Sequence, residues 1–149
     1  YVEFVKLRSG EALFGHDLVR ASIGILRRQL RLVPAANPFD AYKARFALDM
    51  PWLINESIET FHLYSFATLR QFGACYEWSA TYLQWLHDMK TPGLSNAICA
   101  FNELSTGAKT IQFQLARAMN RKRPLDLTFL DSLEATWQGA MDDLKTNFG

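Results

Sequence analysis

The fold is decided by residues 55–89, NESIETFHLYSFATLRQFGACYEWSATYLQWLHDM, which contain no proline and a single glycine, Gly73. Their apolar residues recur at spacings of three and four rather than alternating, which predicts one long α-helix. The main stripe is Ile58, Phe61, Leu69, Phe72, Tyr76, Leu83 and Leu86. A second apolar set covers much of the remaining circumference: Leu63, Phe66, Ala67, Ala74, Trp78, Tyr82 and Trp85. We therefore expect a central helix with neighbours on more than one side, and Gly73 is where a bend costs least.

Length and composition predict a single helical core. The chain has 149 residues, of which 49% are hydrophobic and 13% aromatic, and this suits one domain that needs neither metal nor disulfide. A net charge of +1 argues against nucleic acid as the main partner, because phosphate binding needs a clear basic excess. No segment resembles a signal peptide or a membrane span. We expect a cytoplasmic protein without a membrane partner.

The first residues do not fit a helical domain. Residues 1–7, YVEFVKL, alternate like a short strand, and no second strand is predicted to pair with it. A lone strand is not stable in water. We therefore expect residues 1–10 to be the remnant of a missing N-terminal domain that supplies the sheet, and residues 11–149 to form the helical bundle domain.

Two helices are predicted before the central one. The first covers residues 11–33 and stops at Pro34, because proline cannot donate the next helical hydrogen bond. The second is shorter and covers residues 38–50, with Asn37 as its N-cap and Pro38 at its first position. We expect Pro51 to end this helix.

Two amphipathic helices are predicted after the central one. Thr91 is expected to cap the fourth helix, with Pro92 at its first position, and the basic turn at residues 121–123 closes it. The last helix covers residues 128–147. Four long helices joined by short turns predict an all-α fold: an antiparallel four-helix bundle, with the segment 38–50 packed on it as an additional short helix.

The central helix carries few polar residues, and they gather on one side. Four of them fall within a sector of roughly 40° when each residue advances about 100°. They are Glu59, Arg70, Glu77 and Gln84, with His62 nearby. One interpretation is a solvated surface strip. The other is a polar seam inside the bundle or beneath a missing domain, where Arg70 and Glu77 would have to pair.

Several motifs for catalysis or metal binding are incomplete. Glu59 and His62 match half of the E-x-x-H pattern of di-iron bundles, and no second copy exists, so we expect no metal site. The D-S-L at residues 131–133 resembles the attachment motif of carrier proteins, but too few residues follow it, and we interpret it as a helix start. Cys75 and Cys99 lie within predicted helices, where cysteines are commonly inert small hydrophobes. The catalytic residues stay unknown.

Basic residues concentrate in two places. Arg20, Arg27 and Arg31 follow an i, i+7, i+11 spacing on the first helix, and the turn at residues 121–123 reads Arg-Lys-Arg. Most such runs are simply solvated. If functional, they suit docking of an acidic protein surface by electrostatic steering.

Residues 61–74, FHLYSFATLRQFGA, together with Glu77 and residues 82–86, YLQWL, resemble an uncharacterised bacterial family. The genes of this family accompany amino acid:carrier protein ligases, relatives of aminoacyl-tRNA synthetases that load carrier proteins. Further matching positions are Pro34, residues 37–39 (NPF), 108–109 (AK), 112–113 (QF) and 115–117 (LAR). The resemblance covers most of this chain and only the C-terminal half of the family.

The resemblance implies a role beside an aminoacylated carrier protein, in moving its acyl group onward. Any cysteine-centred catalytic apparatus would then lie in the missing N-terminal part, so this chain alone would be inactive and the full-length protein an acyltransferase. Any phosphopantetheine would be carried by the acidic carrier-protein partner. Arg20, Arg27 and Arg31 are the candidates for docking that partner.

Two functions stay open on this basis. The first is a helical accessory or recognition domain of a carrier-protein-dependent aminoacyl or acyl transfer protein, and the second is a non-catalytic structural or protein-interaction module. A cavity lined by the polar candidates would favour the first, and their exposure to bulk solvent would favour the second. These candidates for the polar seam or substrate recognition are His62, Arg70, Glu77, Lys109 and Gln112.

Overall fold

The computed structural model describes residues 10, 12–123 and 125–149. About four fifths of these residues are helical and none of them is in a strand, which confirms the all-α class. The predicted strand, residues 1–7, lies outside the described residues. The elements are α1 (Gly15–Leu30), α2 (Pro38–Leu53), α3 (Ile58–Ser65), the π-helix η1 (Phe66–Arg70), α4 (Gln71–Asp88), α5 (Ser95–Arg121) and α6 (Phe129–Phe148).

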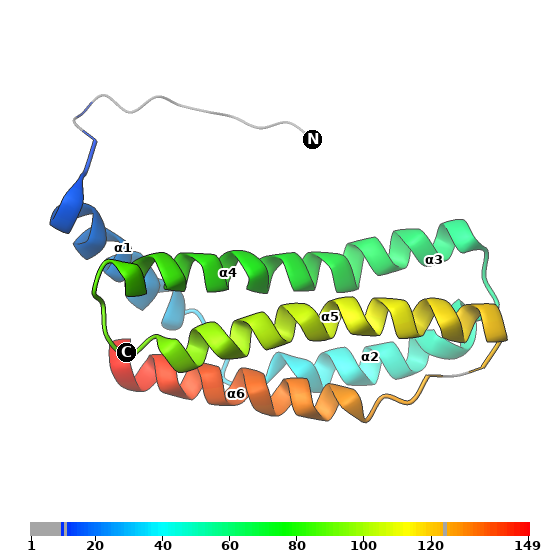
Figure 1. The fold of residues 1–149 in the computed structure, drawn as a ribbon. Helices are drawn as coiled ribbons and strands as arrows, with labels where there is room; N and C mark the ends of the chain where they lie inside the picture. Colours follow the sequence, from blue (N-terminus) through cyan, green and yellow to red (C-terminus); the bar gives the residue numbers. More distant parts are fainter. Residues whose placement is uncertain (1–9, 11, 124) are drawn as a thin grey trace.

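The bundle consists of four rods. α3, η1 and α4 form one continuous rod, which packs along α5, while α6 lies on the other side of α5 and α2 runs behind both (Figure 1). Successive rods alternate in direction, as expected for helices joined by short turns. The additional helix is α1 rather than the segment 38–50: α1 lies at the end of the bundle where α4 and α6 terminate (Figure 1).

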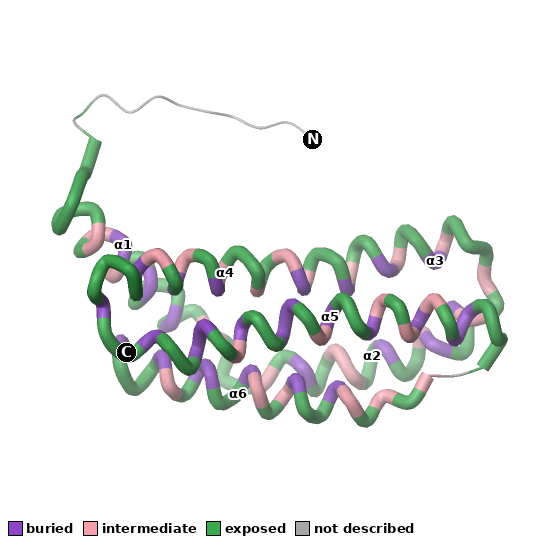
Figure 2. Tube along the Cα trace, viewed as in Figure 1, coloured by how far each residue is buried: buried purple, intermediate pink, exposed green. Residues whose placement is uncertain are grey.

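The core lies where the rods face one another, and Figure 2 shows the buried residues concentrated there. Burying large apolar side chains is the main driving force for such a fold. The largest fully buried apolar side chains are Phe46, Leu53, Leu69, Leu83, Leu86, Leu94, Leu104, Ile111, Leu115, Leu130 and Leu144. They come from every rod of the bundle, so it has one shared core.

The outer side of the central rod is exposed. Tyr82 and Trp85 of the second apolar set are half-buried, but Leu63 is 74% exposed and Trp78 is 75% exposed. The expectation that this set is covered was therefore wrong for part of it. α5, α2 and α1 contact the central rod on its inner side and at one end, and none of the described elements covers its outer side.

A π-helical turn interrupts the central rod. In η1 each hydrogen bond spans one residue more than in an α-helix, so the side chains before it are rotated relative to those after it. The shift is that of about one residue, or about 100°. Thr68 Oγ1 also donates to the carbonyl of Tyr64 at 2.8 Å. The irregularity thus falls at residues 66–70 rather than at Gly73.

Helix ends follow the local sequence rules in some places only. Asn37 caps α2 as predicted, because its side chain accepts a hydrogen bond from the backbone N–H of Phe39 at 3.0 Å. Pro51 does not end α2, which continues to Leu53. The missing N–H of a proline costs one bond near the end of the helix, and the N–H of Ile54 still reaches the Met50 carbonyl at 3.1 Å.

The start of α5 also differs from the prediction. The helix begins at Ser95 with Leu94 in the N-cap position, so neither Thr91 nor Pro92 opens it. Gly93 adopts a φ of 75°, a left-handed conformation that a helix cannot contain and that glycine accepts at little cost. Helix can therefore begin only after this residue.

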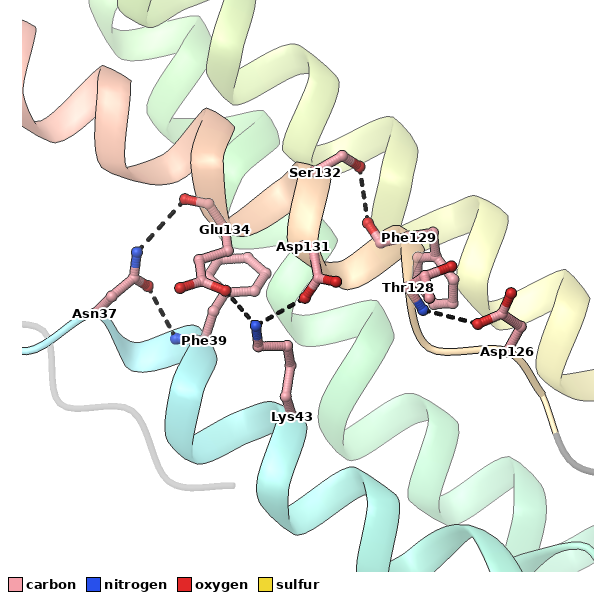
Figure 3. Close-up of polar contacts among 9 residues, drawn as sticks. All are labelled: Asn37, Phe39, Lys43, Asp126, Thr128, Phe129, Asp131, Ser132 and Glu134. Carbon is pink, nitrogen blue, oxygen red and sulfur yellow. Dashed lines mark hydrogen bonds and ion pairs between the residues drawn. The ribbon is translucent and has the colours of Figure 1, made fainter.

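Polar contacts join α2 to the first turns of α6 (Figure 3). Lys43 Nζ lies 2.8 Å from Asp131 Oδ1 and also pairs with Glu134. Asn37 Nδ2 donates to the Glu134 carbonyl at 3.4 Å. The pKa of Lys43 is raised, mainly by its hydrogen bond to Asp131 and next by its hydrogen bond to Glu134. Asp131 thus serves the α2–α6 contact. The D-S-L at residues 131–133 begins in the first turn of α6, which starts at Phe129, and this agrees with its interpretation as a helix start.

None of the helices in the described part of the chain has the length and apolar character that crossing a membrane requires.

Candidate functional site

Four of the five polar candidates meet in a groove between the central rod and α5. Arg70 closes η1, Glu77 lies on α4, and Lys109 and Gln112 lie on α5. All four line a groove of about 280 Å³. The sequence interval between the two pairs is long, so their meeting follows from the antiparallel packing of the rod on α5.

At Gly73, which lines the groove, α4 and α5 approach each other closely. A Cβ atom added to Gly73 would lie 3.1 Å from the Cβ of Ala108 and 3.5 Å from the Ser105 carbonyl oxygen. Side chains at both positions are therefore kept small, and the two helix backbones come close together. Gly73 serves helix packing, which the sequence did not reveal.

Two of the three charged groups of the groove pair with each other. Lys109 Nζ lies 2.9 Å from Glu77 Oε2, and both side chains are 59% exposed. The Arg70 guanidinium lies over the Phe66 ring, 5.6 Å from its centroid. The anticipated pairing of Arg70 with Glu77 is replaced by the pairing of Glu77 with Lys109. Exposed pairs of this kind stabilise a fold by only ~0.2–1 kcal/mol, so the groove is a polar surface feature rather than a buried seam.

His62 does not join the groove. It lies on α3, is exposed, and contacts the Phe61 ring at 5.3 Å between centroids. A regular helix would have placed it near the sector of Arg70 and Glu77, but η1 rotates α3 relative to α4. The apolar periodicity contains no signal of this π-helical turn.

Glu59 has a local role at the start of α3. Ser57 is the N-cap residue, and its Oγ accepts a hydrogen bond from the Thr60 backbone N–H at 3.2 Å. Backbone and side-chain hydrogen bonds within this first turn lower the pKa of Glu59. The carboxylate is thereby suited to the positive end of the helix dipole. Glu59 and His62, the two residues of the E-x-x-H pattern, are both exposed to solvent.

The basic residues of α1 are all exposed. Arg20 pairs with Asp17 at 2.8 Å on the surface, while Arg27 and Arg31 have no ion pair within the described ranges of the chain. The apolar side chains of Leu18 and Ile25 are exposed on the same helix. Residues two positions apart on a helix are separated by about 200° of rotation, so Leu18 and Ile25 lie on a different flank of α1 from Arg20 and Arg27.

α1 is anchored on the bundle from its middle to its C-terminal end. Ser22, Leu26 and Leu30 are buried, whereas Leu18 is exposed. Tyr82 on α4 adds a hydrogen bond, since its hydroxyl donates to the Ser22 carbonyl at 2.6 Å. The anchored side faces α4 and α6, which leaves the arginine side free to meet another molecule.

The basic turn at residues 121–123 is divided by the fold. Lys122 adopts a left-handed conformation with φ of 50°, and its Nζ donates to the Ile54 carbonyl at the end of α2 at 2.7 Å. Arg121 and Arg123 instead line a pocket together with Arg117, which the sequence analysis did not single out. The four-residue spacing of Arg117 and Arg121 on one helix was the available signal.

Both cysteines are exposed rather than buried. Cys75 lies on α4 and Cys99 on α5, and both are free thiols. Their exposure does not fit small hydrophobes that pack inside the bundle, and their inertness stays a prediction. In the described part of the chain, no three or more His, Cys, Asp or Glu side chains come together as a metal site would require.

The comparisons with known proteins identify a family and leave the function open. No curated protein and no solved structure matches the chain significantly. The model of one family, the DUF1839 C-terminal domain, matches residues 15–146. This range runs from the first residue of α1 almost to the end of α6. The match thus includes the arginines of α1, the groove and the Arg117 pocket. The chain belongs to the DUF1839 C-terminal domain family.

Proposed function

We propose that this domain is a helical recognition module that docks an acidic carrier protein through the basic face of α1, in a protein that transfers aminoacyl or acyl groups. The observation that carries the proposal is the exposure of Arg20 and Arg27 on α1 and of Arg31 at its C-cap, while the helix is anchored by another side. A carrier protein that docks on this basic face would have to present acidic residues to it. Complementary charge speeds the encounter of two proteins and sets their orientation.

Exposed apolar residues on another flank of α1 also suit a protein partner. Leu18 and Ile25 are exposed on α1. A partner that contacts both flanks of this helix can bury the apolar area while it pairs charges with the arginines. Under this proposal the partner contacts the arginines first, and the aliphatic contacts then hold the complex.

The groove of Arg70, Glu77, Lys109 and Gln112 is the candidate for contacts to the acyl group or its phosphopantetheine arm. The exposure of its Glu77–Lys109 pair, however, favours the second function, a non-catalytic protein-interaction module. The two differ in one measurable respect. A recognition groove would bind the loaded carrier protein more tightly than the unmodified one, and an interaction module would not distinguish them.

The docking proposal is tested by titrating an acidic carrier protein, in its unmodified form, against two triple variants. Arg20→Glu, Arg27→Glu and Arg31→Glu together reverse the α1 face. Arg117→Glu, Arg121→Glu and Arg123→Glu together make the same change of charge at the opposite end of the bundle. Each exposed ion pair contributes only ~0.2–1 kcal/mol, so binding should be weak and should weaken further with salt.

We expect the α1 variant to lose binding and its salt dependence, while the variant at the opposite end keeps both. The thermal stability of the two variants should stay close to that of the wild type, because every substituted side chain is exposed. Equal losses in both variants would show that only net charge matters. Unchanged binding by the α1 variant would contradict the proposal.

A further inference from the structure

A pocket of about 450 Å³ lies where α5 ends and α6 begins. Arg117 and Arg121 line it from the last turns of α5, Arg123 from the connecting loop, and Thr128 and Phe129 from the start of α6. These residues share no part of the groove between α4 and α5, and the pocket lies at the end of the bundle away from α1 (Figure 1). It is a separate concave site with a marked charge.

The fold separates the arginines from the neighbouring lysine. Lys122 is turned to the end of α2 by its left-handed backbone, where its Nζ binds the Ile54 carbonyl. The pocket therefore receives guanidinium groups, which are planar and bind two oxygens of one anion at a time. Within residues 10, 12–123 and 125–149, no carboxylate forms an ion pair with Arg117, Arg121 or Arg123.

One carboxylate lines the pocket and is already engaged. Asp126 Oδ1 accepts a hydrogen bond from the Thr128 backbone N–H at 3.0 Å, which Figure 3 shows, and this bond lowers the pKa of the carboxyl. Three guanidinium groups against one carboxylate leave a net positive charge in the pocket. The start of α6, a 20-residue helix, adds the positive end of its dipole.

A buried polar atom without a partner lies in the same wall. Gln114 lines the pocket, and its Oε1 is buried with no hydrogen-bond partner among the described residues. A buried amide oxygen left unpaired costs free energy, so this side chain is not fully satisfied within the fold. Gln114 thus adds a polar side chain to the wall of the pocket.

We propose that Arg117, Arg121 and Arg123, with Gln114 and the start of α6, form a binding site for a small phosphate ester. The three guanidinium groups match the several oxygens of one phosphate group. The volume exceeds what the phosphate alone fills, and Ala118, Leu125 and Phe129 give the remaining wall an apolar character. The organic part of the ester contacts this wall. The site is independent of the docking face on α1.

The test follows backbone amide chemical shifts of the 149-residue chain during titration with three probes at constant ionic strength. The probes are inorganic phosphate, phenyl phosphate and phenol. We expect saturable shifts at Thr128 and Phe129 with both phosphates, tighter binding of phenyl phosphate because of Phe129, and no saturation with phenol. Arg117→Gln with Arg121→Gln should weaken phenyl phosphate binding by about tenfold or more. Arg20→Gln with Arg27→Gln on α1 is the matched control and should leave it unchanged.

Three results would overturn the inference. The first is the absence of saturable shifts at the start of α6, and the second is equal binding by the Arg117/Arg121 variant and the wild type. The third is a phosphate affinity that falls equally in the α1 control, which indicates binding by net charge alone. Equal affinity for phosphate and phenyl phosphate would overturn the role of the ester group. If the double variant fails to fold, Arg123→Gln alone, in the exposed loop, replaces it.

Discussion

α1 and α5 both carry an amphipathic sequence, and the fold treats them differently. In α5 one face is buried from end to end, from Ala97 to Met119. In α1 only Ser22, Leu26 and Leu30 are buried, and the apolar residues Leu18 and Ile25 remain exposed. An apolar face indicates that a helix packs against something, but it does not indicate whether the rest of the chain or another molecule covers that face. α5 is covered by its own bundle, and the exposed part of α1 is the surface on which we place a partner.

The largest contrast is expected from a core substitution in α5. Leu104 is fully buried, so Leu104→Ala should lower the free energy of unfolding by ~2–5 kcal/mol through lost contacts and the cavity left behind. The matched control is Trp78→Ala on the outer side of α4, where the side chain is exposed and the change should stay within ~0.5 kcal/mol. Chemical denaturation of both variants measures this. Similar losses would mean that the outer side of the rod is covered after all.

A smaller and more local effect is expected when α1 loses an anchor. Leu30→Ala removes one of the two leucines that hold α1, and the site at the edge of the bundle can partly collapse, so we expect ~2 kcal/mol. Amides of α1 should then exchange with solvent much faster, while those of α5 keep their protection. Equal acceleration in both helices would show that α1 is an integral part of the bundle.

The smallest effect is expected from the hydrogen bond between α4 and α1. Tyr82→Phe removes the donor to the Ser22 carbonyl and should cost ~0.5–1.5 kcal/mol. Burial raises the pKa of Tyr82, so the folded state holds this proton more tightly than the unfolded chain. The contribution of the Tyr82 hydroxyl to the free energy of unfolding is therefore complete below the pKa of about 10 that tyrosine has in the unfolded chain. It is lost as the pH rises through the higher pKa of the folded state.

The measurement is the difference in unfolding free energy between the wild type and Tyr82→Phe across alkaline pH. Burial also raises the pKa of Tyr42, to about 12, but that residue is present in both proteins and cancels from the difference. The difference should shrink above pH 10. A difference that stays constant there would show that the Tyr82 hydroxyl does not hold α1.

Much of the fold was predictable because it follows local rules and periodicity. The central helix, the stripe from Phe61 to Leu86 and the Asn37 cap depend on residues close together in the sequence. Pro51 and Thr91 were misjudged for local reasons too. A proline in a last turn costs little, and the left-handed Gly93 delays the start of α5.

The candidate site was less predictable because it depends on how helices are rotated and packed. Arg70, Glu77, Lys109 and Gln112 do come together, but His62 is turned away by η1, whose extra residue leaves no trace in the apolar spacing. Charge clusters pose the same difficulty. The arginines of α1 and those of the Arg117 pocket look alike in the sequence, and only the fold makes one face convex and the other concave.

The most direct test of the docking proposal is where an acidic carrier protein touches this domain. In the titration described above, amide chemical shifts of the labelled domain reveal the contact surface. We predict that the perturbed amides lie along α1, around Arg20, Arg27 and Arg31, and that the shifts fade as salt is added. Perturbations confined to the bundle, with α1 unaffected at low salt, would contradict the proposal.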